Sequence, residues 1–337
     1  MAEQRSLTIA DLGELDLIER LKPFCAPNAV GDDGALIAVD AGHRLVVTTD
    51  VLVDTVHFSD RTTPPFTVGW RAVAANLSDL AAMGAAPLGI TVGLGLPPET
   101  PWAWVKSLYE GMAACLREYG GAIVGGDVCR AAQRTVSITA LGQVWPEWAI
   151  RRDTAVPGMS VVVTGAHGGS RAGLAMLLGE LEGCDTTAAA GWIRSHQQPV
   201  PRFDAIFELN QRMPLAGPRP AIAGMDSSDG LANALLQLSK SSGVGMDIMR
   251  SRIPLPAGLS AAVGRDLAIN WALYGGEDFE LVLCLPPDLA TSFAAASGAT
   301  ILGKTTHTGI VQVLFWTADE KPTPMSIPLS HKSFQHF

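Results

Sequence analysis

Hydrophobic and polar positions along the first half of the chain follow two different periods. Short runs rich in valine, leucine and threonine at residues 44–51 and 135–142 are typical of β-strands. Longer stretches at residues 67–83 and 102–119 repeat their apolar positions at helical spacing. The first half is therefore predicted to be a mixed α and β domain.

The second half shows the same kind of pattern. An apolar strand at residues 160–164 leads into a glycine-rich turn at 165–170 and a helix at about 172–178. A later helix and strand are predicted at residues 231–241 and 279–285. No short-period repeat occurs, so the chain is not predicted to be a repeat protein.

The two halves are separated by a segment rich in turn-forming and charged residues at 145–158, which includes Pro146 and Pro157. An apolar strand follows it directly. We therefore expect a domain boundary there, with an N-terminal domain at residues 1–148 and a C-terminal domain at 149–337.

Composition and charge narrow the class of protein. A chain of 337 residues with 47% hydrophobic and 17% charged residues is long enough for two globular domains. The formal net charge of -9 disfavours nucleic acid and anionic membranes as partners, because both would be repelled. The N-terminal segment contains acids and no continuous apolar core, so it predicts neither a signal peptide nor a membrane span.

The five cysteines predict a reducing compartment. They are odd in number, widely spaced and form no Cys-x-x-Cys pair that would suggest zinc or a redox motif. We expect reduced thiols in or near the core and a cytoplasmic location. The cysteines are Cys25, Cys115, Cys129, Cys184 and Cys284.

Aspartates recur at the ends of apolar runs and beside glycines, where side chains can converge on a ligand. Four clusters stand out: residues 31–34, 48–50, 125–127 and 226–230. For any one cluster alone, an ordinary turn or helix cap is the simpler interpretation. Their number is what favours a shared site.

A fifth carboxylate, Asp79, lies three residues after Asn76 on a predicted helix, so the two project from the same face, and that face can meet the strand ends. Five acidic positions brought together would repel one another unless cations neutralised them or some took up protons. Magnesium is the natural cation, because it takes oxygen ligands and bridges to nucleotide phosphates.

No Gly-x-x-x-x-Gly-Lys-Ser/Thr loop occurs, and none of the six lysines falls inside an aspartate cluster. Phosphate binding must therefore use metal bridges, glycine amides or arginines. Amides of the turn at residues 165–170 could hold a phosphate at the positive end of the following helix. The alternative is that these glycines only allow the chain to reverse.

Two further features suggest substrate contacts. The segment at residues 274–279 places Glu277 and Asp278 between a glycine pair and a strand, which suggests a carboxylate at a strand entrance. The alternative is a solvated turn. His57 could contact a substrate, although a lone histidine is more often structural or exposed.

Taken together and in order, these segments resemble the thiamine-monophosphate kinase family, within the superfamily that includes aminoimidazole ribonucleotide synthetase and selenophosphate synthetase. The resemblance spans nearly the whole chain. Its most specific pieces are Gly31-Asp32-Asp33-Gly34-Ala35-Leu36, Asn76-Leu77-Ser78-Asp79-Leu80-Ala81-Ala82-Met83-Gly84-Ala85, Ser228-Asp229-Gly230-Leu231, Gly275-Gly276-Glu277-Asp278 and His336-Phe337.

The resemblance implies a two-domain α/β (α+β) fold of the PurM-like type. An N-terminal mixed sheet would form a barrel with a second copy in a homodimer, and a C-terminal α/β domain would complete the nucleotide and substrate site. The implied reaction is the ATP-dependent phosphorylation of thiamine monophosphate to thiamine diphosphate. Transfer of the γ-phosphoryl group would be direct and in line, with several Mg²⁺ ions and no general base.

The resemblance also implies roles for individual residues. The predicted metal ligands are Asp33, Thr48, Thr49, Asp50, Asp79, Asp127, Asp226 and Asp229. The predicted ATP contacts are Tyr109, Gly126, Asp127, Arg152 and Ser228. The predicted contacts to thiamine monophosphate are His57, Glu277 and Phe334.

The sequence departs from the family pattern at a few positions, namely Thr48, Asp54-Thr55 and Val128-Cys129. Thr48 keeps an oxygen ligand, whereas Asp54-Thr55 lies near the presumed acceptor. One alternative is another ATP-dependent member of the superfamily, which would phosphorylate a carbonyl oxygen or selenide. A second is a non-catalytic nucleotide-binding regulator, but such a protein would usually have lost metal ligands that this chain keeps.

Overall fold

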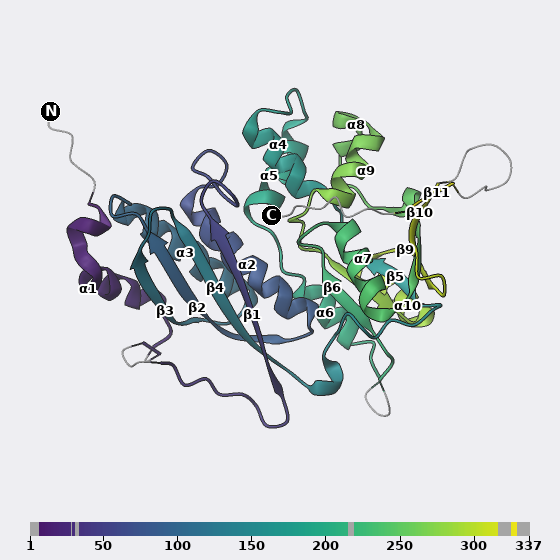
Figure 1. Ribbon diagram of the computed structural model, residues 1–337, viewed down its shortest axis with the longest axis horizontal. Coiled ribbons are helices and arrows are strands. Elements are labelled where there is room, and N and C mark those ends of the chain that lie inside the picture. The colour runs from purple at the N-terminus through teal and green to yellow at the C-terminus, as the bar shows by residue number, and fades with distance from the viewer. Residues whose placement is uncertain (1–6, 28, 31–33, 215–218, 316–324, 329–337) are drawn as a thin grey trace. The chain divides into compact units, whose positions relative to one another are not determined.

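The structure is a computed structural model that describes residues 7–27, 29–30, 34–214, 219–315 and 325–328 (Figure 1). Two predicted site residues, Asp33 and Phe334, lie outside the described residues. The chain divides into two compact units, one of residues 1–80 and 85–146 and one of residues 81–84 and 147–337. Each unit is described below by itself. The domain boundary predicted from the sequence lies between residues 148 and 149, and the functional division between two domains stays a prediction.

The first unit is built around a four-stranded sheet in the order β1-β4-β2-β3. The β1–β4 and β2–β4 pairs are antiparallel and the β2–β3 pair is parallel. Its elements are α1 (Ile9–Leu21), η1 (Lys22–Phe24), β1 (Arg44–Val53), α2 (Pro65–Ala82), β2 (Ala86–Leu96), α3 (Trp102–Tyr119), β3 (Ile123–Arg130) and β4 (Thr135–Val144).

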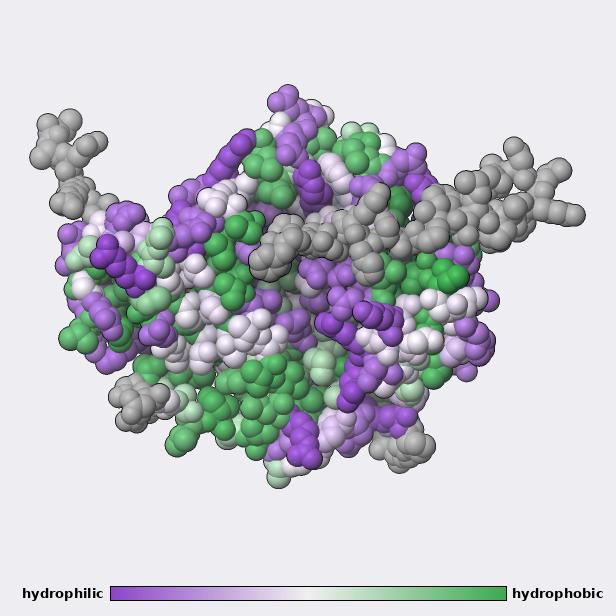
Figure 2. Space-filling view, in the orientation of Figure 1, coloured by the Kyte–Doolittle hydropathy of each residue, from purple (hydrophilic) through white to green (hydrophobic). Residues whose placement is uncertain are grey.

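The two faces of this sheet differ. Helices α2 and α3 cover one face, where Ile138 of β4 and Val92 of β2 are fully buried (Figure 1). On the other face the side chains of Leu45, Val47 and Val51 on β1 are 49%, 55% and 45% exposed. Figure 2 shows hydrophobic residues gathered over this part of the surface. We call it the open face of the sheet.

Helices α2 and α3 approach each other closely because glycines stand at their crossing. A Cβ atom at Gly69 would lie 1.9 Å from the Leu108 carbonyl oxygen, and one at Gly111 would lie 1.8 Å from the Phe66 carbonyl oxygen. There is no room for a Cβ atom at either position, so only glycine permits this packing. The close crossing holds α2, with its predicted metal ligand, firmly against the sheet.

The second unit has a seven-stranded sheet in the order β11-β10-β7-β9-β5-β8-β6. Its strands are β5 (Ser160–Val163), β6 (Ala223–Asp226), β7 (Gly245–Met249), β8 (Leu281–Leu285), β9 (Thr300–Thr306), β10 (Val311–Phe315) and β11 (Met325–Pro328). Its α-helices are α4 (Gly169–Leu178), α5 (Thr186–Gln197), α6 (Phe203–Asn210), α7 (Leu231–Ser242), α8 (Leu259–Val263), α9 (Arg265–Tyr274) and α10 (Pro287–Ser297), and two 3₁₀ turns lie at η2 (Pro146–Trp148) and η3 (Arg250–Arg252).

Helices lie on both faces of this sheet, because its strands bury side chains on each side. In β5, Val161 and Val163 pack in one cluster with residues of α7 and α9. Val162 packs in another cluster with residues of α6 and α10. The ends of β6 and β8 therefore sit in a fixed frame. Asp226, Ser228 and Asp229 lie at the end of β6 and in the loop that follows it, and Glu277 lies in the loop that precedes β8.

Most predicted elements are present with small changes in their ends. The predicted helix at residues 102–119 is α3 without change, and the predicted strand at 44–51 extends to Val53. The expectation that residues 48–50 and 125–127 end their strands was wrong, because the backbone ladder continues beyond them. Asp50 pairs with Ile138 and Asp127 pairs with Gly93 inside the sheet.

Two composition-based expectations can also be compared with the structure. Cys115 and Cys284 are buried, but Cys129 is exposed on β3, so not all of the cysteines lie in or near the core. Among the helices that the structure describes, none combines the length and hydrophobicity needed to cross a bilayer.

Candidate active site

The first group of predicted ligands lies where β1 crosses α2, on the covered face of the sheet. Thr48 and Asp50 are two residues apart on β1, so their side chains project to the same side. The Thr48 hydroxyl donates to Asp79 Oδ2 at 2.5 Å, and the Asp50 amide donates to Asn76 Oδ1 at 3.1 Å. The prediction that Asn76 and Asp79 face the strand together is therefore confirmed.

Asn76 is fixed in turn by its own helix, because its side-chain amide donates to the Ala72 carbonyl at 2.9 Å. The group thus offers hydroxyl and carboxylate oxygens on two rigid elements, a donor set that suits Mg²⁺. Within the described part of the chain, no three His, Cys, Asp or Glu residues lie close enough to form a complete metal site. Thr48, Asp50 and Asp79 therefore fit Mg²⁺ as a partial ligand set.

Thr49 and Asp127 are not brought to this group. Thr49 points to the open face, where its hydroxyl lies 2.8 Å from that of Thr139. Asp127 belongs to β3, at the opposite edge of the sheet, and its register with Gly93 also places it on the open face. With strands about 4.8 Å apart, three steps separate β1 from β3 by about 14 Å. One copy of the unit therefore does not unite Asp50 and Asp127.

A cavity of about 530 Å³ lies beside β3, within the first unit. Three predicted ATP contacts, Tyr109, Gly126 and Asp127, line it. The other walls come from α1, η1, the segment after η1, and β2, including Ile18, Leu21, Lys22, Cys25, Ala29, Val30, Gly34, Ala35 and Thr91. Its size is typical of a small-molecule site, and its walls combine apolar and polar groups in similar proportion.

Tyr109 and Gly126 shape this cavity in different ways. Tyr109 is buried on α3 against Phe24, with ring centroids 5.6 Å apart, and burial raises the pKa of its phenol. It is therefore a neutral hydroxyl at physiological pH. A Cβ atom at Gly126 would lie 2.3 Å from the Val92 carbonyl oxygen, so glycine is required by the packing of β3 on β2.

Sequence reasoning missed the wall that α1 and η1 contribute. Residues 22–25 carry no motif, and they reach the cavity because the Ala26 amide donates to the Ile123 carbonyl of β3 at 2.7 Å. This pairing lines Lys22 and Cys25 along the cavity. It joins segments about one hundred residues apart, so no local pattern predicts it.

His57 lies in a turn directly after β1. The Val53 amide donates to His57 Nδ1 at 3.0 Å, so the ring proton belongs on Nε2. The neighbouring Asp54 is held by Arg134, whose Nε donates to Asp54 Oδ2 at 2.7 Å, and Thr55 takes a positive φ of 65°. The departure at Asp54-Thr55 is thus part of the turn structure that orients His57.

The second unit brings four predicted residues into two adjoining loops. The Ser228 hydroxyl donates to Asp226 Oδ1 at 3.0 Å, and Asp229 follows at the start of α7. The Glu277 amide donates to the Ser228 carbonyl at 2.6 Å. A Cβ at Gly276 would lie 2.9 Å from the same carbonyl, so glycine is needed for this contact. The predicted metal, ATP and substrate residues of this unit are therefore neighbours.

Glu277 is held in a backbone conformation that favours glycine, with φ of 58°. Such strain in a non-glycine residue often marks a functional site. Its carboxylate Oε2 lies 3.7 Å from Nδ1 of the buried His196, which also lies 3.0 Å from the Ser170 hydroxyl. The arrangement orients a partly exposed carboxylate at the surface of the loop.

Of the two interpretations of the turn at residues 165–170, the structure does not favour the phosphate site, because a side chain of the protein itself occupies two of the amides. Gly168 and Ser170 donate their N–H groups to Asp278 at 2.6 and 2.9 Å. Asp278 therefore occupies the positive end of α4. Burial raises the pKa of this carboxyl to about 7, although the amide hydrogen bonds oppose the shift.

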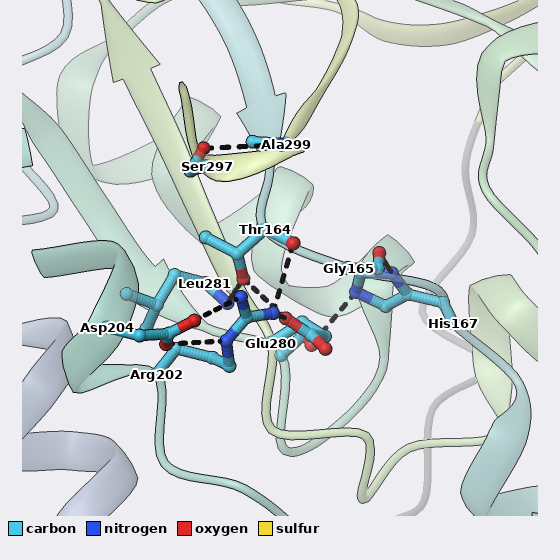
Figure 3. Close-up of polar contacts among 10 residues, drawn as sticks. Thr164, Gly165, His167, Arg202, Asp204, Glu280, Leu281, Ser297 and Ala299 are labelled. Atoms are coloured by element: carbon cyan, nitrogen blue, oxygen red, sulfur yellow. Dashed lines mark hydrogen bonds and ion pairs between the residues drawn. The ribbon is translucent and has the colours of Figure 1, made fainter. Parts of the chain in front are cut away.

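Arg152 and an ion-pair network around Arg202 are two further polar features of this unit. Arg152 is exposed and donates to Gln237 of α7 at 3.0 Å. Figure 3 shows Arg202 between Asp204 and Glu280, with ion-pair distances of 2.9 and 2.5 Å. Burial raises the pKa of Glu280, while Arg202 and Thr164 stabilise its charged form. No sequence motif points to this network.

Comparisons with known proteins agree with this architecture. The family described as AIR synthase related protein, N-terminal domain, matches residues 31–144. The thiamine-monophosphate kinase of Synechococcus elongatus is 45% identical over 332 residues, covering 98% of both chains. That of Escherichia coli K12 is 33% identical over 316 residues and 91% of both chains.

Solved structures give the same result. The thiamine-monophosphate kinase of Stenotrophomonas maltophilia K279a is 31% identical with a TM-score of 0.76, covering 90% of this chain and 96% of that one. AaThiL complexed with AMPPCP and TMP is 30% identical with a TM-score of 0.72, covering 96% and 99%. The hydrogenase maturation protein HypE in complex with ATP, at 18% identity and a TM-score of 0.72, shares the fold. With a near full-length relative at 45% identity, the chain belongs to the thiamine-monophosphate kinase family.

Proposed function

We propose that this protein transfers the γ-phosphoryl group of ATP directly and in line to the phosphate of thiamine monophosphate, giving thiamine diphosphate and ADP. The observation that carries the proposal is the cavity in the first unit. The chain that contains it matches thiamine-monophosphate kinases over nearly its full length. The cavity is lined by Tyr109, Gly126 and Asp127, three of the residues expected at ATP.

ATP would occupy this cavity with its phosphates toward β3. Gly126 leaves main chain exposed at the cavity wall, where a side chain would be excluded by Val92. Among the described residues that line the cavity, Lys22 supplies a positive charge for an anion, and it is paired with Glu19 at 2.5 Å. From the second unit, Arg152 and Ser228 are proposed as further ATP contacts.

Several Mg²⁺ ions are proposed to assist the reaction. The proposed ligands are Asp33, Thr48, Thr49, Asp50, Asp79, Asp127, Asp226 and Asp229. When bound, the ions would neutralise the repulsion between the two phosphate groups. The chain's own contribution is a preformed oxygen set, because Thr48 holds Asp79 and Asn76 holds the backbone of Asp50. An ionised acceptor phosphate needs no general base, so positioning supplies most of the catalysis.

Glu277, His57 and Phe334 are proposed to bind thiamine monophosphate. A partly exposed carboxylate at Glu277 suits the positively charged thiazolium ring. His57 would donate through Nε2, since Nδ1 already accepts from Val53. An aromatic side chain such as Phe334 suits both the cationic ring and the aminopyrimidine.

We also propose a homodimer in the cytoplasm. The open face of the first unit exposes Leu45, Val47 and Val51 in one row, and a second copy would cover them. Pairing of two such sheets into a barrel would also cover edge strands that otherwise invite aggregation. The cytoplasmic location rests on the five separate cysteines.

The reaction is tested by following thiamine diphosphate directly in purified protein with ATP and magnesium. Thiamine monophosphate, free thiamine and no acceptor are compared, each with and without EDTA. We expect diphosphate only from the monophosphate and only without EDTA. ATP hydrolysis without diphosphate in any sample would contradict the proposed acceptor.

A further inference from the structure

His167 lies in the turn between β5 and α4 and is completely buried. Its backbone amide donates to the Pro254 carbonyl at 3.0 Å, which fixes the turn. Its ring bridges two segments: Nδ1 lies 3.1 Å from the Gly165 carbonyl oxygen (Figure 3), and Nε2 lies 3.0 Å from the Ser227 hydroxyl. Neither contact follows from the predicted site residues.

The two contacts determine the protonation of the ring. A carbonyl oxygen only accepts, so Nδ1 must carry the proton, and Nε2 then has a lone pair that accepts from the Ser227 hydroxyl. Burial lowers the pKa of His167 to about 4, in agreement with a neutral ring. The direction of the Ser227 O–H bond is therefore set by the Gly165 carbonyl through the imidazole.

Ser227 is itself bound at every polar group. Its amide donates to the Glu280 carbonyl at 2.8 Å, and its own carbonyl accepts from the Gly230 amide at 2.8 Å. With the hydroxyl bound to His167, no polar group of this 1% exposed residue is left for solvent. Ser227 is the fixed point of the turn at residues 226–229.

The residues beside Ser227 are those with predicted ligand roles. Asp226 and Ser228 flank it, and Ser228 donates to Asp226 at 3.0 Å. The Ser228 carbonyl accepts from the Glu277 amide, so the turn also sets the position of the neighbouring loop. A displacement of Ser227 would move all of these groups together.

We propose that His167 is a positioning residue, whose neutral imidazole accepts a hydrogen bond from the Ser227 hydroxyl at Nε2 and thereby holds the turn at residues 226–229 in the geometry that nucleotide binding needs. The role rests on the proposed function, but the residue touches neither substrate. It acts through Ser227. The Glu280 carbonyl provides the second anchor of the same turn, and the Glu280 side chain is fixed by Arg202 and Thr164.

The test compares two substitutions at one position. His167→Gln keeps a neutral acceptor that can reach Ser227, whereas His167→Leu keeps bulk and removes the acceptor. Mutation of a residue that orients metal ligands typically lowers metal affinity or activity by about 10–100-fold. We expect kcat/KM for ATP to fall by about 10-fold or more in His167→Leu and to stay within about 3-fold in His167→Gln. His307→Leu, at an exposed histidine after β9, is the control for loss of a histidine.

Two readouts do not depend on turnover. In the ligand-free protein, the amides of residues 228–230 should exchange hydrogen faster in His167→Leu than in wild type or His167→Gln. The ¹⁵N shifts of the His167 ring should show a protonated Nδ1 and an unprotonated Nε2. If His167→Leu fails to fold, Ser227→Ala, which removes only the donor, should show the same faster exchange.

Three results would overturn the proposal. The first is a protonated Nε2 on His167. The second is unchanged amide hydrogen exchange at residues 228–230 together with unchanged kcat/KM in His167→Leu. The third is equal impairment of the His167→Gln and His167→Leu variants, which would show that the ring only fills space. If the wild type forms no thiamine diphosphate, the proposed function fails, yet the exchange and ¹⁵N results still decide whether His167 holds the turn.

Discussion

At the scale of single residues, the site is organised by hydrogen bonds that fix which atom carries a proton. His57 and His167 each have one ring nitrogen committed to a backbone group, with opposite results: Val53 N–H makes Nδ1 of His57 an acceptor, while the Gly165 carbonyl makes Nδ1 of His167 a donor. The sequence alone does not show which ring nitrogen of either histidine carries the proton. The backbone group that each ring contacts determines whether Nδ1 donates or accepts, and the fold determines which backbone group that is.

The buried His167 predicts a pH dependence of stability. Its pKa is about 4 when folded and 6.5 unfolded, so the unfolded state binds the extra proton between these values. The stabilisation is complete above pH 6.5 and is lost as pH falls toward 4. The difference in unfolding free energy between wild type and His167→Gln should therefore be constant above pH 6.5 and shift by about 3 kcal/mol against wild type by pH 4.

Urea unfolding of both proteins at several pH values measures this difference. Other titrating groups, including Asp278, whose raised pKa gives a slope of opposite sign, are common to both proteins and cancel. A difference that stays constant from pH 7 to pH 4 would contradict a buried neutral ring at this position.

Thr48 gives a second prediction at this scale. Its hydroxyl donates to Asp79 and is itself a proposed metal ligand, so Thr48→Val removes both functions without changing the shape of the side chain. We expect the magnesium concentration for half-maximal activity to rise by about 10-fold or more. Thr48→Ser keeps the hydroxyl and should remain close to wild type. Equal magnesium dependence in all three proteins would remove Thr48 from the metal site.

At the scale of elements, local patterns predicted helices and strands well and predicted their partners poorly. Helix α3 and the face of α2 that carries Asn76 and Asp79 follow from spacing, because helical periodicity is local. Strand β8 begins at Leu281, not at residue 279, because Glu277 and Phe279 take positive φ values. Long-range pairing could not be predicted, since no local signal encodes strand order.

The candidate site was predictable to a similar extent. The residues at the metal, ATP and substrate positions came from the family resemblance, and the contact between Thr48 and Asp79 agrees with the expected meeting of helix and strand. The wall formed by Lys22 and Cys25 and the link from His167 to Ser227 were missed. These depend on contacts between segments that are distant along the chain.

Strand β3 offers a prediction with a matched control. A methyl group at Gly126 would lie 2.3 Å from the Val92 carbonyl oxygen, while one at Gly125 would have only Thr91 Cγ2 near it, at 3.7 Å. Gly126→Ala should therefore lower the unfolding free energy by about 1–3 kcal/mol, because the strand must shift. Gly125→Ala should leave stability nearly unchanged. Equal unfolding midpoints in urea for both variants would show that the clash at Gly126 is relieved without cost.

At the scale of the whole molecule, the strand order raises a question about the proposed metal ligands. Asp127 and Asp50 lie on the two outer strands of the four-stranded sheet, about 14 Å apart. Magnesium binds oxygen at about 2.0–2.1 Å, so one ion cannot join them within a copy. If both serve one reaction, a second copy offers a solution. In the proposed homodimer, placing the β3 edge of one sheet beside the β1 edge of the other would bring the partner's Asp127 near Thr49 and Asp50.

Mixing two inactive variants tests this arrangement. Asp50→Ala and Asp127→Ala should each abolish turnover in a homodimer. After subunit exchange, about half of the dimers are mixed, and each mixed dimer has one site with both aspartates intact. Activity should therefore return to roughly a quarter of wild type.

The control mixture combines Asp50→Ala with Asp79→Ala, whose side chains belong to the same β1–α2 group. No site in a mixed dimer of these two variants is intact, so activity should not return. Native mass spectrometry would verify that mixed dimers form in both experiments. Mixed dimers of Asp50→Ala and Asp127→Ala without activity would contradict a site that joins Asp50 of one subunit to Asp127 of the other. Recovery in the mixture of Asp50→Ala and Asp127→Ala, but not in the control, would show that catalysis requires the dimer. The β1 edge of one subunit would then supply Asp50 and the β3 edge of the other would supply Asp127 to the same site.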